Sequence, residues 1–125
     1  MKTVIKTEFA PNPIGPYNQA ILANDTLYIS GQIAIDPSTG KLISGDAMEQ
    51  TLRVMKNLEA ILKAAEMDFS NVVKSSIMVT NLDHFAQINE VYGRFFTNNP
   101  PSRETLQASK LPLNSEVEIS MIAVK

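Results

Sequence analysis

The chain has 125 residues, of which 44% are apolar and 19% are charged, and this predicts one folded domain over residues 1–125 rather than a disordered chain. Its 11 Lys and Arg residues against 13 Asp and Glu residues give a net charge of −2; without a basic run, binding to nucleic acid through its phosphates is not expected. The lack of cysteine and the single histidine exclude thiolate zinc sites, a cysteine nucleophile and a two-histidine acid–base mechanism.

Three strands are predicted in the first third of the chain, over residues 3–9, 17–23 and 26–32. Prolines at positions 11, 13 and 16 make the segment after the first strand a stiff loop rather than a flexible linker. Asn24 and Asp25 separate the second and third strands, and both residue types tolerate the positive φ of a tight turn. A β-hairpin is therefore expected there.

Helices and strands alternate in the middle of the chain. The apolar spacing predicts a helix over residues 46–66, capped by Asp46 with Glu49 as its capping-box partner. A β-rich run, residues 72–80, follows this helix. We expect Asp83 to cap a second helix that carries several aromatic residues.

Two final strands, residues 103–109 and 116–124, are predicted to form a hairpin around a turn at residues 111–114. The resulting order, β-β-β-α-β-α-β-β, indicates an α+β fold with both helices on one face of the sheet. No apolar stretch approaches the roughly 18 residues of a membrane-spanning helix, and residues 1–7 lack a signal-peptide core. A cytoplasmic protein without membrane contact is expected.

The strands alternate between apolar and polar side chains, so the sheet should have one face of each kind. The polar face is predicted to collect Tyr28, Ser30, Gln32, Lys74, Ser76, Thr80, Arg103, Thr105, Gln107, Glu118 and Ser120. Two helices cannot cover both faces of such a sheet. An open face that also carries apolar residues predicts self-association.

Arg103 and Glu118 form the sharpest candidate pair. If the last hairpin has a loop of about four residues, Arg103 lies opposite Glu118 on the polar face. One interpretation is an exposed cross-strand ion pair, which stabilises a fold little. The other is an arginine that binds an anion beside a carboxylate that orients water.

Six stretches along the chain match a known pattern in combination, although each alone is a weak signal. They are residues 10–19, 28–32, 72–76, 85–92, 101–112 and 117–124. With these stretches the chain resembles the Rid family (reactive intermediate deaminases, also called the YjgF family), most closely its RidA branch, over essentially its whole length. The resemblance implies a chorismate-mutase-like fold of the bacillus type, with a six-stranded, mostly antiparallel sheet and two helices on one face. It also implies a homotrimer with clefts between subunits.

The activity that this resemblance implies is hydrolysis of 2-iminobutanoate and 2-iminopropanoate, or their enamine tautomers, to 2-keto acids and ammonia. Pyridoxal-phosphate enzymes release these imines, and the family uses no cofactor or metal. Its essential arginine and its water-orienting glutamate fall on Arg103 and Glu118. Its other substrate-binding positions fall on Tyr17, Ser30, Asn89 and Thr105. We expect Tyr17 of one subunit to meet Arg103 and Glu118 of another.

The chain departs from the family pattern at three places. Thr105 replaces a frequent cysteine, so a main-chain contact is expected there and no thiol role. Ser120 replaces the second glutamate of the family's last strand, and the loop before Arg103 is short. These departures concern the range of substrates more than the reaction.

The predicted chemistry needs only the arginine and the glutamate. The planar guanidinium of Arg103 matches a carboxylate through two hydrogen bonds, and Glu118 can deprotonate the water that attacks the imine carbon. Three alternatives stay open: a regulatory protein that binds small ligands in the same pocket without turnover, an endoribonuclease or translation inhibitor, and a holdase chaperone.

Overall fold

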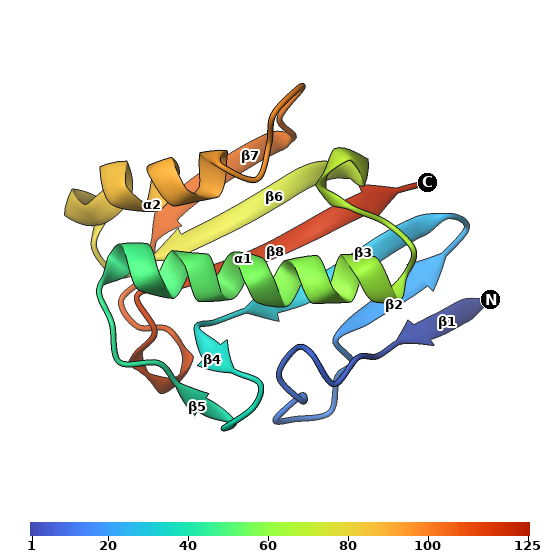
Figure 1. Ribbon diagram of the computed structural model, residues 1–125, viewed down its shortest axis with the longest axis horizontal. Coiled ribbons are helices and arrows are strands. Elements are labelled where there is room, and N and C mark those ends of the chain that lie inside the picture. Colours follow the sequence, from blue (N-terminus) through green and yellow to red (C-terminus); the bar gives the residue numbers. More distant parts are fainter.

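Two helices, α1 (Ala47–Ala64) and α2 (Phe85–Gly93), pack on the same face of a six-stranded sheet in the computed structural model, which describes residues 1–125 (Figure 1). The strands lie in the spatial order β1-β2-β3-β8-β6-β7, and only β6 and β7 run parallel. Their bounds are β1 (Lys2–Ile5), β2 (Ala20–Ala23), β3 (Thr26–Gln32), β6 (Val72–Val79), β7 (Ser102–Gln107) and β8 (Val117–Val124). The predicted α+β fold class is confirmed.

A smaller two-stranded hairpin, β4 (Ile35–Asp36) with β5 (Lys41–Leu42), follows β3 and was not predicted. The β2–β3 hairpin was predicted and is confirmed: Asn24 and Asp25 both have positive φ, 49° and 64°. β1 ends four residues earlier than expected, at Ile5 rather than at residue 9. None of the helices has the length and apolar content needed to cross a membrane.

The loop between β1 and β2 is held by one buried side chain. Gln19 accepts a hydrogen bond from the Thr7 main-chain N–H (2.8 Å) and donates to the carbonyl of Pro11 (2.9 Å). It is only 2% exposed. Because buried amides that satisfy main-chain groups fix a loop's path, this segment is presented in one conformation.

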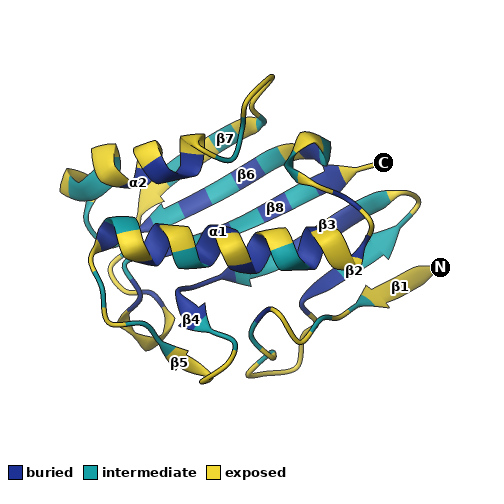
Figure 2. Cartoon of the chain, viewed as in Figure 1, coloured by how far each residue is buried: buried dark blue, intermediate teal, exposed yellow.

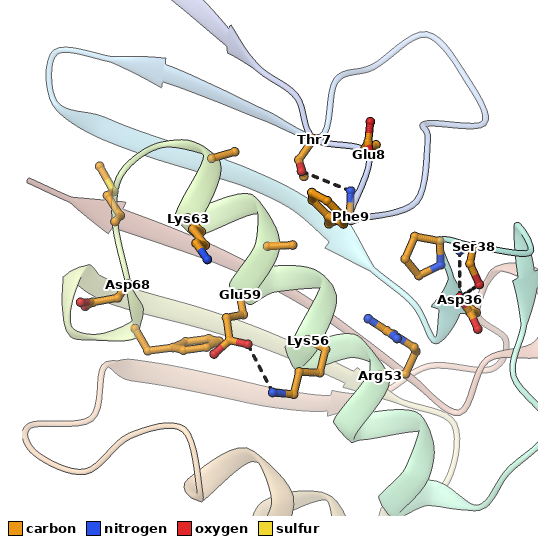
Figure 3. Close-up of a pocket in the computed structure, with 15 residues that line it drawn as sticks. Thr7, Glu8, Phe9, Asp36, Ser38, Arg53, Lys56, Glu59, Lys63 and Asp68 are labelled. Carbon is orange, nitrogen blue, oxygen red and sulfur yellow. Dashed lines mark hydrogen bonds and ion pairs between the residues drawn. The ribbon is translucent and has the colours of Figure 1, made fainter.

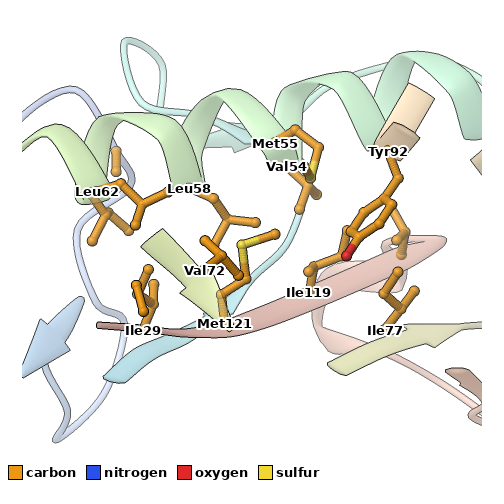
Figure 4. Packing of buried hydrophobic residues seen from close by; sticks show 14 of the residues in the cluster. Ile29, Val54, Met55, Leu58, Leu62, Val72, Ile77, Tyr92, Ile119 and Met121 are labelled. Carbon is orange, nitrogen blue, oxygen red and sulfur yellow. The ribbon is translucent and has the colours of Figure 1, made fainter. Parts of the chain in front are cut away.

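Helix α1 begins as predicted. The Asp46 carboxylate accepts from the N–H of Glu49 (2.9 Å), and the Glu49 side chain accepts from the N–H of Asp46 (3.2 Å), which is a capping box. Its apolar stripe faces the sheet and forms the centre of the core (Figure 4). The largest fully buried side chains of this stripe are Val54, Met55, Leu58, Ile61 and Leu62.

Replacing Leu58 with alanine should lower the free energy of unfolding by about 3 kcal/mol, because the side chain is fully buried and the rigid neighbours cannot fill the cavity. Denaturant unfolding measures the change. Leu52→Ala, on the solvent side of the same helix at 40% exposure, is the matched control and should change stability far less. Equal losses in the two variants would contradict this packing.

Helix α2 carries the chain from β6 to the parallel strand β7. Its predicted cap was wrong: Asn81, not Asp83, accepts from a main-chain N–H, and it caps the short 3₁₀ turn Leu82–His84 that precedes α2. Parallel neighbours need such a crossover, since a tight turn can join only antiparallel strands.

The prediction of a hairpin between the last two strands was also wrong. β7 lies at the edge of the sheet, and the chain then passes β6 so that β8 inserts between β3 and β6. A 3₁₀ turn at Pro112–Asn114, close to the predicted turn, lies on this path. Along β8, buried residues that face the helices alternate with half-buried residues on the open face (Figure 2). β8, and β6 from Lys74 onward, therefore have the predicted parity, whereas β7 does not.

Candidate active site

Arg103 lies on the edge strand β7 and faces α2, not the open face. It pairs in register with the buried Ser75 of β6, and its Nη1 donates to Oδ1 of Asn89 at 2.7 Å. Its Cζ lies 5.3 Å from the centroid of the Phe85 ring and 5.1 Å from that of Tyr92. Arg103 takes part in none of the chain's ion pairs. Its charge is thus available to a ligand.

Thr105 lies two residues further along β7, on the same face as Arg103. Its hydroxyl oxygen is buried and has no hydrogen-bond partner, the only such side-chain atom in the chain. Arg103, Asn89 and Thr105 therefore lie together at one edge of the sheet. We call these three residues the arginine half of the site.

Glu118 lies on β8 and faces the open side of the sheet, opposite Met78 of β6. Its carboxylate has no hydrogen-bond or ion-pair partner in the chain, and burial raises its pKa above the ordinary value. Gly31 of β3 lies directly beside it: a Cβ built on Gly31 would be 2.9 Å from the Glu118 Cδ. Sequence reasoning did not place Gly31 in the site, although a glycine inside a strand often marks a close approach.

Ser30 precedes Gly31 and connects this strand to the loop that carries Tyr17. Its hydroxyl donates to the carbonyl of Asn18 (2.6 Å), and its N–H donates to the carbonyl of Gln19 (2.9 Å). Tyr17 itself is 48% exposed. The Ser30 hydrogen bonds thus join β3 to the loop that carries Tyr17, and the close approach at Gly31 joins β3 to Glu118. The four residues in this region are Tyr17, Ser30, Gly31 and Glu118. We call these four residues the glutamate half of the site.

The predicted pairing of Arg103 with Glu118 inside one chain was wrong. β6 separates their strands, which puts the two backbones about 10 Å apart, and the two side chains leave opposite faces of the sheet. The parity of β7 was misjudged because this strand carries only one large apolar residue, Leu106, which is 49% exposed on the open face. One ligand cannot contact both side chains of the same chain.

A wide cleft elsewhere on the molecule contains none of these residues (Figure 3). It has a volume of about 1430 Å³ and lies between α1 and the loop after β1. Among the charged groups that line it, Lys56 pairs with Glu59 (3.4 Å), and Asp36 accepts from the Ser38 main-chain N–H (2.8 Å). The cleft is therefore not where the candidate chemistry is located.

Comparisons with known proteins agree with the fold. Residues 7–125 match the family model described as Endoribonuclease L-PSP. The chain is 44% identical over 125 residues to the human 2-iminobutanoate/2-iminopropanoate deaminase, covering all of this chain and 91% of that protein.

Two solved structures are similar over nearly the whole chain. YyfA of Yersinia pestis, described as a member of the conserved Rid protein family, matches with a TM-score of 0.97 and 43% identity over 100% of both chains. TdcF of E. coli, solved with bound serine, matches with a TM-score of 0.94 and 36% identity over 98% of both chains.

Proposed function

This chain belongs to the Endoribonuclease L-PSP family, the Rid or YjgF proteins, and we propose that it hydrolyses small 2-imino acids to 2-keto acids and ammonia. 2-Iminobutanoate and 2-iminopropanoate are the substrates proposed, because they are named for the human relative. One observation carries the proposal: Arg103 is held at the sheet edge by an amide and two rings, with no acidic partner. Such a cation suits a small carboxylate ligand.

Arg103 binds the substrate carboxylate in this proposal. The guanidinium presents several N–H donors in one plane, and Asn89 takes only one of them. Two parallel donors remain for the two oxygens of a carboxylate. The structure of the E. coli relative TdcF contains bound serine, and serine also has an α-carboxylate. This supports a site for small carboxylates in this family.

Glu118 acts on the attacking water. Its carboxylate takes a proton as the water oxygen bonds to the imine carbon and returns it to the nitrogen, which gives a carbinolamine. The carbinolamine hydroxyl then gives up its proton, which Glu118 transfers to the amine. The C–N bond breaks as the C=O bond forms, and ammonia leaves. The balance is one imine and one water consumed for one 2-keto acid and one ammonia. Burial raises the pKa of Glu118, which makes its carboxylate a better proton acceptor.

A homotrimer completes the site in this proposal. One chain cannot bring Arg103 and Glu118 to one ligand, whereas the arginine half of one subunit can meet the glutamate half of its neighbour. The open face supports such an assembly because it exposes large apolar side chains, Tyr28 (51%) and Leu106 (49%) among them.

Experiments can distinguish two other functions from imine hydrolysis. A regulatory protein would bind 2-keto or amino acids through Arg103 and turn nothing over. An endoribonuclease, the activity in the family's description, would need to bind a phosphate backbone, which a net charge of −2 does not favour.

Coupling the protein to a threonine dehydratase tests the proposal. The protein should accelerate conversion of 2-iminobutanoate to 2-ketobutanoate in the presence of a scavenger of free imine. Arg103→Ala should abolish the acceleration, and Arg103→Lys should lose most of it, about 100-fold, because an ammonium cannot bind the carboxylate through two parallel donors. Excess chelator should not change the rate.

Three outcomes would contradict the proposal. Full activity in Arg103→Lys would show that the guanidinium does not bind the carboxylate. Arg103-dependent binding of 2-ketobutanoate without turnover would favour the regulatory protein. Cleavage of RNA by wild type and Arg103→Ala alike, without imine hydrolysis, would favour a nuclease that does not use the Arg103 site.

The pH dependence of kcat/KM should show the ionisation of the Glu118 carboxyl. As pH falls through its raised pKa, the carboxylate is protonated and kcat/KM should fall, at a higher pH than for an ordinary exposed glutamate. Glu118→Gln should be inactive at every pH. The Glu118→Gln variant should also unfold at a higher temperature than wild type at neutral pH. A raised pKa means that the folded chain favours the protonated carboxyl of Glu118, so wild type loses stability as pH rises and this carboxyl ionises, whereas glutamine stays neutral. A Glu118→Gln variant with an unchanged pH profile would contradict the role.

A further inference from the structure

We propose that Phe85 and Tyr92 are positioning residues for Arg103: their rings hold the guanidinium in place while its hydrogen-bond donors stay free for the ligand. The inference rests on the proposed function in one respect, that Arg103 binds a carboxylate. It assigns a role to two residues of α2 that the helix pattern alone would give only to packing.

Three residues on one side of α2 contact the guanidinium of Arg103. Phe85, Asn89 and Tyr92 are spaced by four and then three residues, so they lie on the same side of the helix. The Arg103 Cζ lies 5.3 Å from one ring centroid and 5.1 Å from the other, and the Asn89 amide oxygen accepts from its Nη1 at 2.7 Å. Both rings are within the roughly 6 Å over which a cation is attracted to an aromatic ring.

The rings resolve a conflict that any carboxylate-binding arginine faces. An acidic neighbour would hold the side chain firmly, but it would occupy two donors and cancel the charge that the ligand needs. Rings attract the cation without taking any N–H group. Arg103 has no acidic partner, and only Asn89 takes one of its five donors.

Tyr92 is itself fixed. It is 5% exposed, and its hydroxyl donates to the Ser75 Oγ at 2.9 Å. Burial raises the pKa of the Tyr92 phenol, so the group stays protonated and keeps this bond. Ser75 is the register partner of Arg103 on the adjacent strand. The ring, the strand pair and the guanidinium therefore form one rigid unit, as a precise binding site requires.

Phe85→Leu tests the role, because leucine keeps the apolar contact and removes the ring. The affinity for 2-ketobutanoate, measured by calorimetry, should fall about five-fold, and KM for 2-iminobutanoate should rise by the same factor with kcat unchanged. Phe85→Trp, which restores a ring, should recover both values. Phe85→Met takes the place of Phe85→Leu if that variant does not fold.

Phe69→Leu is the matched control. Phe69 packs against Phe95 and Phe96 beside the same helix, with centroids 5.2 Å and 5.4 Å away, but it does not contact Arg103. It should lose stability and keep the wild-type affinity. If Phe69→Leu weakened binding as much as Phe85→Leu, a general loss of packing would explain both and the positioning role would be overturned.

The two proposals fail in different ways. An active wild type with an unchanged KM and affinity in Phe85→Leu overturns the positioning role and leaves the proposed function. A wild type that binds 2-ketobutanoate through Arg103 and Phe85, but hydrolyses no imine, overturns the proposed function and supports the positioning role. A wild type with neither binding nor turnover overturns both.

Discussion

Mixed oligomers of Arg103→Ala and Glu118→Gln chains should regain about a quarter of wild-type activity, although each variant alone should be inactive. The reason is the separation of the two side chains on opposite faces of one chain. In a trimer whose sites each combine the arginine half of one subunit with the glutamate half of the next, every mixed trimer has one intact site of three. About three quarters of randomly assembled trimers are mixed, which gives the expected fraction.

The control mixes two variants of the same half. Glu118→Gln combined with Gly31→Ala should regain nothing, because both changes damage the glutamate half and no arrangement yields an intact site. Native mass spectrometry verifies that the chains have mixed. A mixed population of Arg103→Ala and Glu118→Gln without activity would contradict the shared site, as would an active monomer in sedimentation.

The elements that the sequence predicted well are set by local interactions. The Asp46–Glu49 capping box and the Asn24–Asp25 turn involve residues at most three positions apart, so the pattern carries the whole signal. The parity of β8 was also predictable. Four of its residues, Val117, Ile119, Met121 and Ala123, are buried on the helix side, and each sits between more exposed neighbours.

β7 could not be placed in the same way. Its sequence, with a single large apolar residue at Leu106, suits an edge strand that has little contact with the core, and such a strand does not reveal which parity faces the helices. The helix between β6 and β7 favours a parallel crossover between these two strands, but it does not decide whether β8 then pairs with β7 or with β6.

The residues of the candidate site were named from the sequence, but their arrangement was not predicted. The strand pattern singled out Arg103 and Glu118, and the resemblance assigned them roles and added Asn89. Which of them lie together depends on the order of strands in the sheet, and this order is a long-range property. The contact of Arg103 with Asn89 joins residues 14 positions apart, and that of Gly31 with Glu118 joins two separate strands.

Gly31→Ala should reduce activity about 100-fold with little loss of stability. Gly31 lies at a bulge, where the register between β3 and β8 shifts between Ile29 and Gln32. A methyl group there would overlap the Glu118 Oε2 and lie 2.9 Å from its Cδ, closer than such atoms approach, and 3.1 Å from its Cγ, which is a tight contact. The obstructing atoms belong to the end of a flexible side chain, so the carboxylate can move aside while the backbone keeps its path. Steady-state kinetics and thermal unfolding measure the two effects.

Gly93→Ala is the matched control for this substitution, because a methyl group on Gly93 would meet no atom within 4 Å, and it should keep wild-type activity. A second test is the pair of Gly31→Ala with Glu118→Asp. Aspartate is one methylene shorter and should be poorly placed in the wild-type background, but it leaves room for the new methyl group. The double variant should therefore lose less activity than the product of the two single losses, since changes at contacting residues do not act independently. Strictly multiplicative losses would show that Gly31 does not set the position of the Glu118 carboxylate.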